Sequence, residues 1–171
     1  MEIRDATDAD LPGVLGIYND VIATSTAVFT TDPVTLDDRR TWWESRVAQG
    51  YPVLIAADEA GNVAGFSTFG DFRGAWPGYR HTIEHSVHVR ADLRGAGIGS
   101  ALIEALFPRA GALGKHVMIA GVDAANAGSI RLHERLGFEK VGCLREVGCK
   151  FGRWLDLIFL QRLLNQDRPP A

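Results

Sequence analysis

The chain has 171 residues, of which 46% are hydrophobic and 23% charged, and its formal net charge is −3. This composition is typical of a globular protein and excludes disordered, collagen-like and coiled-coil chains. There is no basic excess for nucleic acid and no run of about 18 apolar residues for a membrane span, so we expect neither partner. We expect a single domain over 1–165, a loose polar tail over 166–171 and a cytoplasmic location.

Hydrophobic periodicity and turn residues predict eleven elements in the order β-α-α-β-β-β-α-β-α-β-β. We place them at residues 3–6, 7–22, 35–49, 53–57, 63–69, 82–89, 94–112, 116–122, 127–136, 139–147 and 154–160. The early strands form hairpin-like antiparallel neighbours, and the helix 94–112 joins two strands as a crossover. We therefore expect a mixed α/β sheet with one β-α-β unit.

The strand 82–89 alternates between two faces. One face carries Ile83, His85, Val87 and Val89, and the other carries Glu84, Ser86 and His88. The strand leads directly into the glycine-rich segment Arg94–Gly99, which opens the crossover helix.

That segment has the chemistry of a pyrophosphate site. Gly95, Gly97 and Gly99 remove side chains that would keep a ligand from the backbone N–H groups, and Arg94 adds positive charge. A P-loop is excluded because Ser100 follows Gly99 without a lysine, and the dinucleotide fingerprint is absent because its third glycine comes one residue early. A coenzyme A site and a tight strand–helix junction both remain compatible with the segment.

A wider set of residues resembles the GNAT acetyltransferase superfamily: Val87-His88-Val89, Arg94-Gly95-Ala96-Gly97-Ile98-Gly99, Asn126 and Leu136-Gly137-Phe138. The resemblance implies acetyl-CoA as cosubstrate and a mostly antiparallel sheet flanked by helices, with splayed central strands. It also implies a cofactor site built from Val87, His88, Val89, Arg94, Gly95, Ala96, Gly97, Ile98, Gly99, Ser100 and Asn126. From its position alone, Asn126 is equally an N-cap of the following helix.

A narrower resemblance is to the phosphinothricin acetyltransferase branch. It rests on Tyr18-Asn19-Asp20, Ser25–Phe29, Glu84–Val89, His133–Phe138 and Gly148–Asp156, and within the branch the methionine sulfoximine and sulfone enzymes are most similar. The resemblance implies acetylation of the α-amino group of such a compound by direct transfer in a ternary complex, which would detoxify it. It also implies a homodimer in which Lys150 and Trp154 reach the partner's site.

Two residues are candidates for proton transfer. The resemblance implies that Glu84 is the general base, directly or through water, although the residues alone allow an outward-facing strand carboxylate. His133 occupies the place where many GNAT enzymes carry a tyrosine that protonates the leaving thiolate. A partly buried helix histidine without a catalytic role is the alternative.

An amino-acid substrate needs a cation for its carboxylate. Arg73 and Arg80 flank a loop that contains Trp76, and each could equally be a solvated arginine. The full set expected to contact substrate is Phe29, Arg73, Gly74, Trp76, Arg80, Glu84, His85 and Ser86. We interpret Cys143 and Cys149 as structural, and we expect no metal at His81, His85 and His88, whose spacing fits no metal motif.

Three other functions remain open: acetylation of protein N-termini, acetylation of aminoglycosides, and a non-catalytic module that senses acyl-CoA. The two arginines disfavour the acidic pocket that an aminoglycoside requires. The presence of both Glu84 and His133 disfavours a module without catalysis.

Overall fold

The computed structural model describes residues 1–166 and 169. Its helices and strands follow the predicted order: β1 (Glu2–Asp5), α1 (Leu11–Thr24), α2 (Leu36–Ala48), β2 (Val53–Ala57), β3 (Val63–Asp71), β4 (Thr82–Val89), α3 (Ile98–Ala112), β5 (Val117–Asp123), α4 (Ala127–Arg135), β6 (Glu139–Lys150) and β7 (Arg153–Leu163). Positions 167–168 and 170–171 of the expected tail lie outside the described residues.

Several predicted boundaries differ from the structure, among them those of α3 and of the β6–β7 hairpin. Helix α3 begins at Ile98 rather than at 94, because Gly97 before it has a left-handed backbone (φ 83°). Strands β6 and β7 are longer than predicted and turn tightly through Phe151 and Gly152, both at positive φ. Positive φ at two consecutive turn residues matches the twist of a two-residue hairpin, so both strands continue to the turn.

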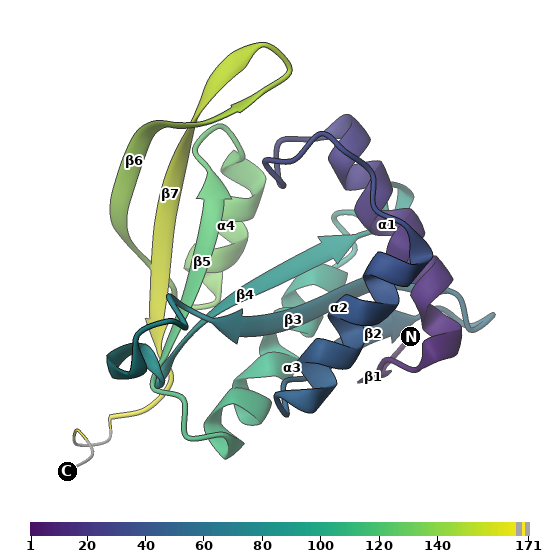
Figure 1. The fold of residues 1–171 in the computed structure, drawn as a ribbon, viewed down its shortest axis with the longest axis horizontal. Coiled ribbons are helices and arrows are strands. Elements are labelled where there is room, and N and C mark those ends of the chain that lie inside the picture. The colour runs from purple at the N-terminus through teal and green to yellow at the C-terminus, as the bar shows by residue number, and fades with distance from the viewer. Residues whose placement is uncertain (167–168, 170–171) are drawn as a thin grey trace.

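The strands form one sheet in the order β1-β2-β3-β4-β5-β7-β6 (Figure 1). All neighbours are antiparallel except β4 and β5, which are parallel and joined by the crossover through α3. The structure thus confirms the mostly antiparallel mixed sheet.

Strands β4 and β5 separate soon after they meet. Their pairing covers Thr82–Glu84 opposite Val117–Ile119, whereas β4 continues to pair with β3 up to Val89. In the described chain, no strand pairs with His85–Val89 on the β5 side. Figure 1 shows the two strands diverging, which confirms the splayed central strands.

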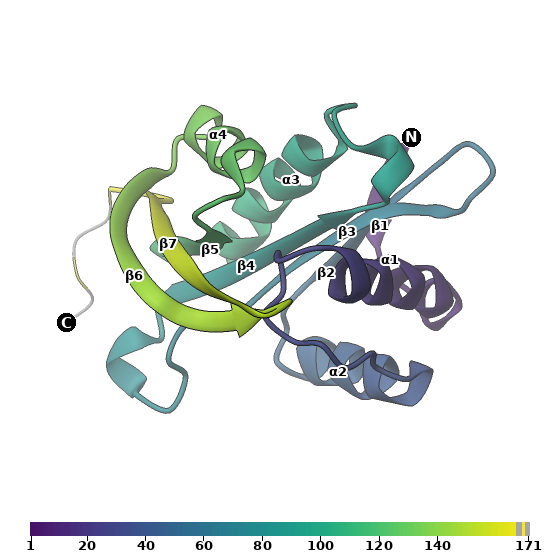
Figure 2. The ribbon, with the colours of Figure 1, turned by 90° about the horizontal axis from the view of Figure 1, so that it is seen from above.

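Helices cover both faces of the sheet. Seen from above, α1 and α2 lie on one side, α3 and α4 on the other, and the β6–β7 hairpin curves away from the rest (Figure 2). The α3 side holds the larger apolar core, which includes Leu102, Leu106, Ile83 and Met118. The α1 side holds a smaller core around Val14 and Phe66. Both faces of β4 are therefore covered, and its alternating side chains enter two different layers.

In the described part of the chain, no helix is long and apolar enough to cross a membrane.

Candidate active site

The glycine-rich segment forms the N-terminal end of α3. Gly95 (φ 84°) and Gly97 (φ 83°) have left-handed backbones, and no atom lies within 4 Å of where a Cβ would be at either position. The first N–H groups of α3 have no partner within the helix and carry the positive end of its dipole. The loop therefore presents an open backbone cradle for an anion, with the exposed Arg94 beside it.

A cavity of about 500 Å³ extends from this cradle along β4 to α4. Every predicted cofactor residue except Ala96 lines it: Val87, His88, Val89, Arg94, Gly95, Gly97, Ile98, Gly99, Ser100 and Asn126. Ala96 lies in the same loop without lining the cavity. The side-chain oxygen of Asn126 accepts a hydrogen bond from Ser129 N at 3.0 Å, so this residue does cap α4. Its predicted bond to a ligand would use its amide nitrogen.

The opposite wall comes from residues that the sequence analysis missed. It is formed by one face of α4: Gly128, Ser129, Leu132 and Arg135. Their spacing of three to four residues places them on one helix face, and that periodicity is the signal that could have found them.

A smaller cavity of about 80 Å³ fills the wedge between the separated strands. From β4 it is lined by His85, Ser86, Val87 and His88, and from the far side by Gly121, Asp123 and His133, among others. The free edge of β4 borders both cavities, and an extended ligand can pair with such an edge as an added strand would.

Glu84 stands where the wedge begins, as the last β4 residue that pairs with β5. Its carboxylate is directed toward β5, since Oε1 lies 3.0 Å from where a Cβ of Gly121 would be. Gly121, which the sequence analysis also missed, therefore leaves space for this carboxylate. Desolvation raises the pKa of Glu84 above its ordinary value of 4.5.

On the other face of β4, two buried histidines contact each other. His133 Nδ1 lies 2.7 Å from the carbonyl oxygen of Ser129, so it carries the proton and donates. His133 Nε2 is therefore an acceptor, and the 3.1 Å contact to His85 Nε2 is a hydrogen bond donated by His85. His85 Nδ1 is left as a buried acceptor without a hydrogen-bond partner among the described residues.

Burial keeps this pair neutral. Desolvation lowers the pKa of His85 to about 3, with a further contribution from His133, and desolvation also lowers the pKa of His133. In the ground state neither nitrogen of His133 directs a proton into the wedge. A role for His133 as the acid for the thiolate therefore requires the His85–His133 bond to open and Nε2 to carry a proton.

His88 lies in the α1 layer, as the alternation predicts. Its ring packs against Tyr18 and Phe66, with centroid distances of 5.6 and 5.2 Å. Desolvation, with the nearby charges of Arg39 and Arg94, lowers the pKa of His88 to about 4. The imidazole is thus a neutral group that packs against two aromatic rings.

The predicted substrate residues do not all come together. His85 and Ser86 line the wedge, while Arg73, Gly74, Trp76 and Arg80 lie exposed on the loop between β3 and β4, outside both cavities. In the described chain neither arginine pairs with a carboxylate. The guanidinium of Arg73 lies over the ring of Tyr79 at 5.4 Å. Phe29 packs against Gly148, where a Cβ would overlap its ring.

Two buried charged residues hold the segment between α1 and α2 over the wedge. Lys150 donates to the carbonyl oxygens of Ser25 (2.6 Å) and Val28 (2.8 Å), and the hydroxyl of Thr26 donates to the Asp123 carboxylate. Lys150 is 2% exposed and bonds within its own chain, which differs from the expected reach into a partner's site. Trp154 is 67% exposed.

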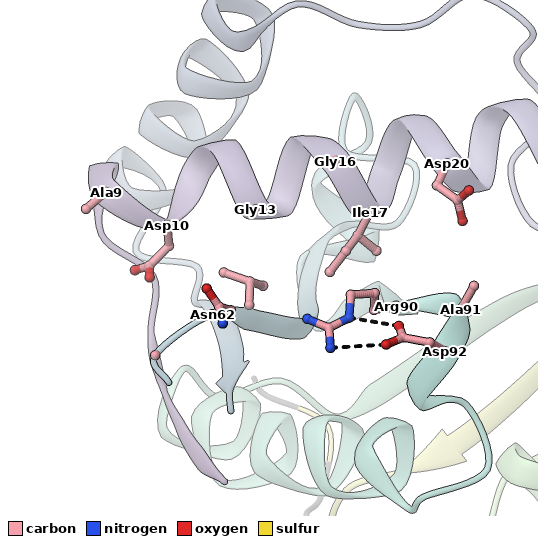
Figure 3. A pocket seen from close by; sticks show the side chains of 12 residues that line it. Ala9, Asp10, Gly13, Gly16, Ile17, Asp20, Asn62, Arg90, Ala91 and Asp92 are labelled. Atoms are coloured by element: carbon pink, nitrogen blue, oxygen red, sulfur yellow. Dashed lines mark hydrogen bonds and ion pairs between the residues drawn. The ribbon is translucent and has the colours of Figure 1, made fainter. Parts of the chain in front are cut away.

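A second groove of about 660 Å³ lies between α1 and the segments Gly61–Val63 and Arg90–Asp92. Arg90 pairs with Asp92, with Nε to Oδ1 at 2.8 Å (Figure 3). Asp10 is held by Arg4, whose hydrogen bonds lower the pKa of Asp10 to about 2. Its arginine is already neutralised and it contains none of the predicted site residues, so the reaction is not assigned to it. Within the described residues, no three His, Cys, Asp or Glu side chains gather as a metal site requires.

Comparisons with known proteins agree with this geometry. The acetyltransferase (GNAT) family model matches residues 14–138. The L-methionine sulfoximine/L-methionine sulfone acetyltransferase of Pseudomonas aeruginosa is 52% identical over 97% of this chain and 96% of its own length. The phosphinothricin N-acetyltransferase of Streptomyces coelicolor is 36% identical over 96% of each chain.

The crystal structure of a GNAT superfamily phosphinothricin acetyltransferase from Sinorhizobium meliloti in complex with acetyl-CoA superimposes with a TM-score of 0.94. It is 36% identical, and the match covers 99% of this chain and 92% of that one. The chain belongs to the GNAT acetyltransferase family and is an N-acetyltransferase that uses acetyl-CoA as cosubstrate.

Proposed function

We propose that this enzyme acetylates the α-amino group of a small amino acid or analogue, such as methionine sulfoximine, methionine sulfone or phosphinothricin. The observation that carries the proposal is the position of Glu84 at the start of the β4–β5 wedge, between the cavity along β4 and the loop with the two arginines. The names of the similar acetyltransferases support the substrate class.

In this proposal the glycine cradle and Arg94 bind the pyrophosphate of acetyl-CoA, and the free edge of β4 at Val87–Val89 pairs with the pantetheine arm and the thioester oxygen. Acetyl-CoA supplies the activated acetyl group. Open space at Gly95 and Gly97, together with the positive end of α3, fits a doubly charged anion. The open β4 edge fits a chain of amides, because its unpaired backbone groups need partners.

Glu84 accepts a proton from the substrate ammonium, so that the amine attacks the thioester directly in a ternary complex. Desolvation raises the pKa of Glu84, which strengthens its carboxylate as a base. Arg73 and Arg80 bind the substrate carboxylate, and Phe29, Trp76 and His85 bound its side chain. His133 remains the candidate acid for the thiolate once its bond to His85 opens and its Nε2 carries a proton.

We also propose a homodimer formed through the β6–β7 hairpin. Strand β6 is an edge strand and is exposed from Glu139 to Val147. Five large apolar side chains on the hairpin are at least 45% exposed: Val141, Leu144, Val147, Phe151 and Trp154. An apolar edge strand invites a covering partner, and a second copy provides the same surface.

A cytoplasmic location is supported by Cys143 and Cys149, which are both free. They are exposed on β6, which does not fit the interpretation that they pack structurally.

Acetylation removes the ammonium charge by which amino-acid analogues resemble natural amino acids. On this basis we propose a role in detoxification.

The proposed substrate class predicts a specific acceptor profile. Release of CoA thiol from acetyl-CoA should be fast with methionine sulfoximine, methionine sulfone or phosphinothricin and slow with short peptides and aminoglycosides. Preferential turnover of peptides or aminoglycosides would contradict the proposal. Thermal stabilisation by acetyl-CoA without turnover of any acceptor would instead favour the acyl-CoA-sensing module.

For the glycine cradle, we expect Gly97→Ala to weaken CoA binding about tenfold, because alanine disfavours the left-handed backbone that opens the end of α3. The matched control is Gly114→Ala, which also has positive φ (66°) and no neighbouring atom within 4 Å but lies outside both cavities. Calorimetric titration with CoA measures both variants. Equal affinities in the two variants would contradict the assignment.

If Glu84 is the base, kcat/KM should fall as pH drops through its pKa, because only the carboxylate accepts a proton. The pKa of Glu84 is raised, so the loss of kcat/KM should occur at a pH above 4.5, which is the ordinary pKa of this carboxyl group. Glu84→Gln should remove this limb and lower kcat/KM about a hundredfold, with the KM for acetyl-CoA unchanged. A variant that keeps full kcat/KM across the pH range would sink the assignment.

For the proposed dimer, the double substitution Leu144→Glu and Val147→Glu should convert the protein to a monomer, since it places charge on the apolar hairpin. Light scattering coupled to size-exclusion chromatography reports the mass. Leu113→Glu, at the exposed end of α3 (43% exposed), is the control and should leave the mass unchanged. A wild-type protein that is monomeric at micromolar concentration would rule out the interface.

A further inference from the structure

A buried lysine lies at the base of the loop that carries the two arginines. Residues 72–81 join β3 to β4, and we call them the arginine loop. Lys115, two residues before β5, is 8% exposed. Its Nζ donates to the hydroxyl of Tyr51 at 2.9 Å and to the carbonyl oxygen of Arg80 at 2.8 Å. Burying an ammonium group is costly unless it has hydrogen-bond partners, and here two oxygens provide them.

The contact reaches both ends of the arginine loop. The hydroxyl of Tyr51 donates to Oδ1 of Asp71, the last residue of β3, and this oxygen lies 3.9 Å from Lys115 Nζ. Arg80 stands near the other end of the loop. Tyr51, Asp71, Lys115 and the carbonyl of Arg80 therefore form one unit, which we call the anchor cluster.

Both the tyrosine ring and its hydroxyl are fixed. The ring of Tyr51 packs against Phe69 in the core, with a centroid distance of 5.3 Å. Burial and the neighbouring Asp71 raise the pKa of Tyr51 to about 12. The hydroxyl therefore keeps its proton at neutral pH and continues to donate to Asp71.

The path of the arginine loop depends on where Asp71 lies. The loop folds back so closely that a Cβ at Gly74 would lie 2.9 Å from Asp71 Cβ. The preceding Arg73 has a left-handed backbone (φ 52°), which an L-residue rarely adopts without support from its surroundings. A shift of Asp71 or of the Arg80 carbonyl would move the start or the end of the loop, and with it one of the two arginines.

We propose that Lys115 and Tyr51 are positioning residues that hold Arg73 and Arg80 at the spacing required to bind the carboxylate of the amino-acid acceptor. This inference rests on the proposed function. Two guanidinium groups recognise a carboxylate only if distance and direction match, so small displacements weaken the preference for acceptors with a carboxylate. Neither Lys115 nor Tyr51 lines the cavities assigned to acetyl-CoA, so binding of the cosubstrate should be unaffected.

The test compares methionine sulfone with its decarboxylated analogue, 3-(methylsulfonyl)propylamine, as acceptors. The ratio of their kcat/KM values measures the preference for the carboxylate. In Lys115→Met and in the milder Tyr51→Phe this ratio should fall about tenfold relative to wild type, mostly through a higher KM for methionine sulfone, with the KM for acetyl-CoA unchanged. The ratio cancels a general loss of active protein, and Tyr51→Phe keeps the ring that packs on Phe69.

Lys140→Met is the matched control, because Lys140 is half-exposed and its only ion pair among the described residues is with Glu134, at 3.4 Å on the surface. It should leave the ratio unchanged. Variants that lose thermal stability but keep the wild-type ratio would overturn the inference and leave a purely structural anchor. A wild-type enzyme without preference for the carboxylate would overturn both this inference and the proposed arginine clamp.

Discussion

The structure depends on the point at which β4 and β5 separate. These strands are the only parallel neighbours of the described sheet, and they pair only at Thr82–Glu84 and Val117–Ile119. Beyond this point β4 stays attached to β3, and β5 stays attached to β7. The sheet therefore consists of two halves, β1–β4 and β5–β7–β6, joined at a short seam where β4 and β5 pair. Backbone groups of β4 that would have paired with β5 border a cavity and remain available to a ligand.

Successive side chains of β4 point to opposite faces of the sheet, so its functional groups lie on two different sides. The Glu84 carboxylate is directed toward Gly121 on β5, whose missing side chain leaves room for it, and desolvation raises the pKa of Glu84. His85, one residue later, enters the opposite layer and bonds to His133, and burial holds both imidazoles neutral. Glu84 and His85 are thus adjacent in the sequence, but their side chains lie on different sides of the sheet. Desolvation raises the pKa of Glu84 and lowers the pKa of both histidines, because it disfavours the charged form of each group.

Local patterns were sufficient for part of this organisation. The strands Val53–Ala57 and Thr82–Val89 match their predicted limits, because hydrophobic runs and alternation are properties of neighbouring residues. The glycine cradle followed from a short motif for the same reason. The His85–His133 bond joins residues 48 positions apart, and Gly121 matters only because Glu84 lies across the seam. Such contacts depend on how the two halves of the sheet meet, which no local pattern specifies.

Residues 25–28, between α1 and α2, cover the wedge, and we call this segment its roof. The segment between α1 and α2 has no strand or helix of its own near Ser25–Val28, so its backbone needs partners from elsewhere. Lys150 supplies donors to two of its carbonyl oxygens, and Asp123 accepts from Thr26. Both anchors belong to the β5–β7–β6 half, whereas α1 packs on the β1–β4 half. The roof thus ties the two halves together above the gap that their seam leaves open. The wedge remains free for a ligand, because side chains over the cavity connect the two halves and no backbone pairing crosses it.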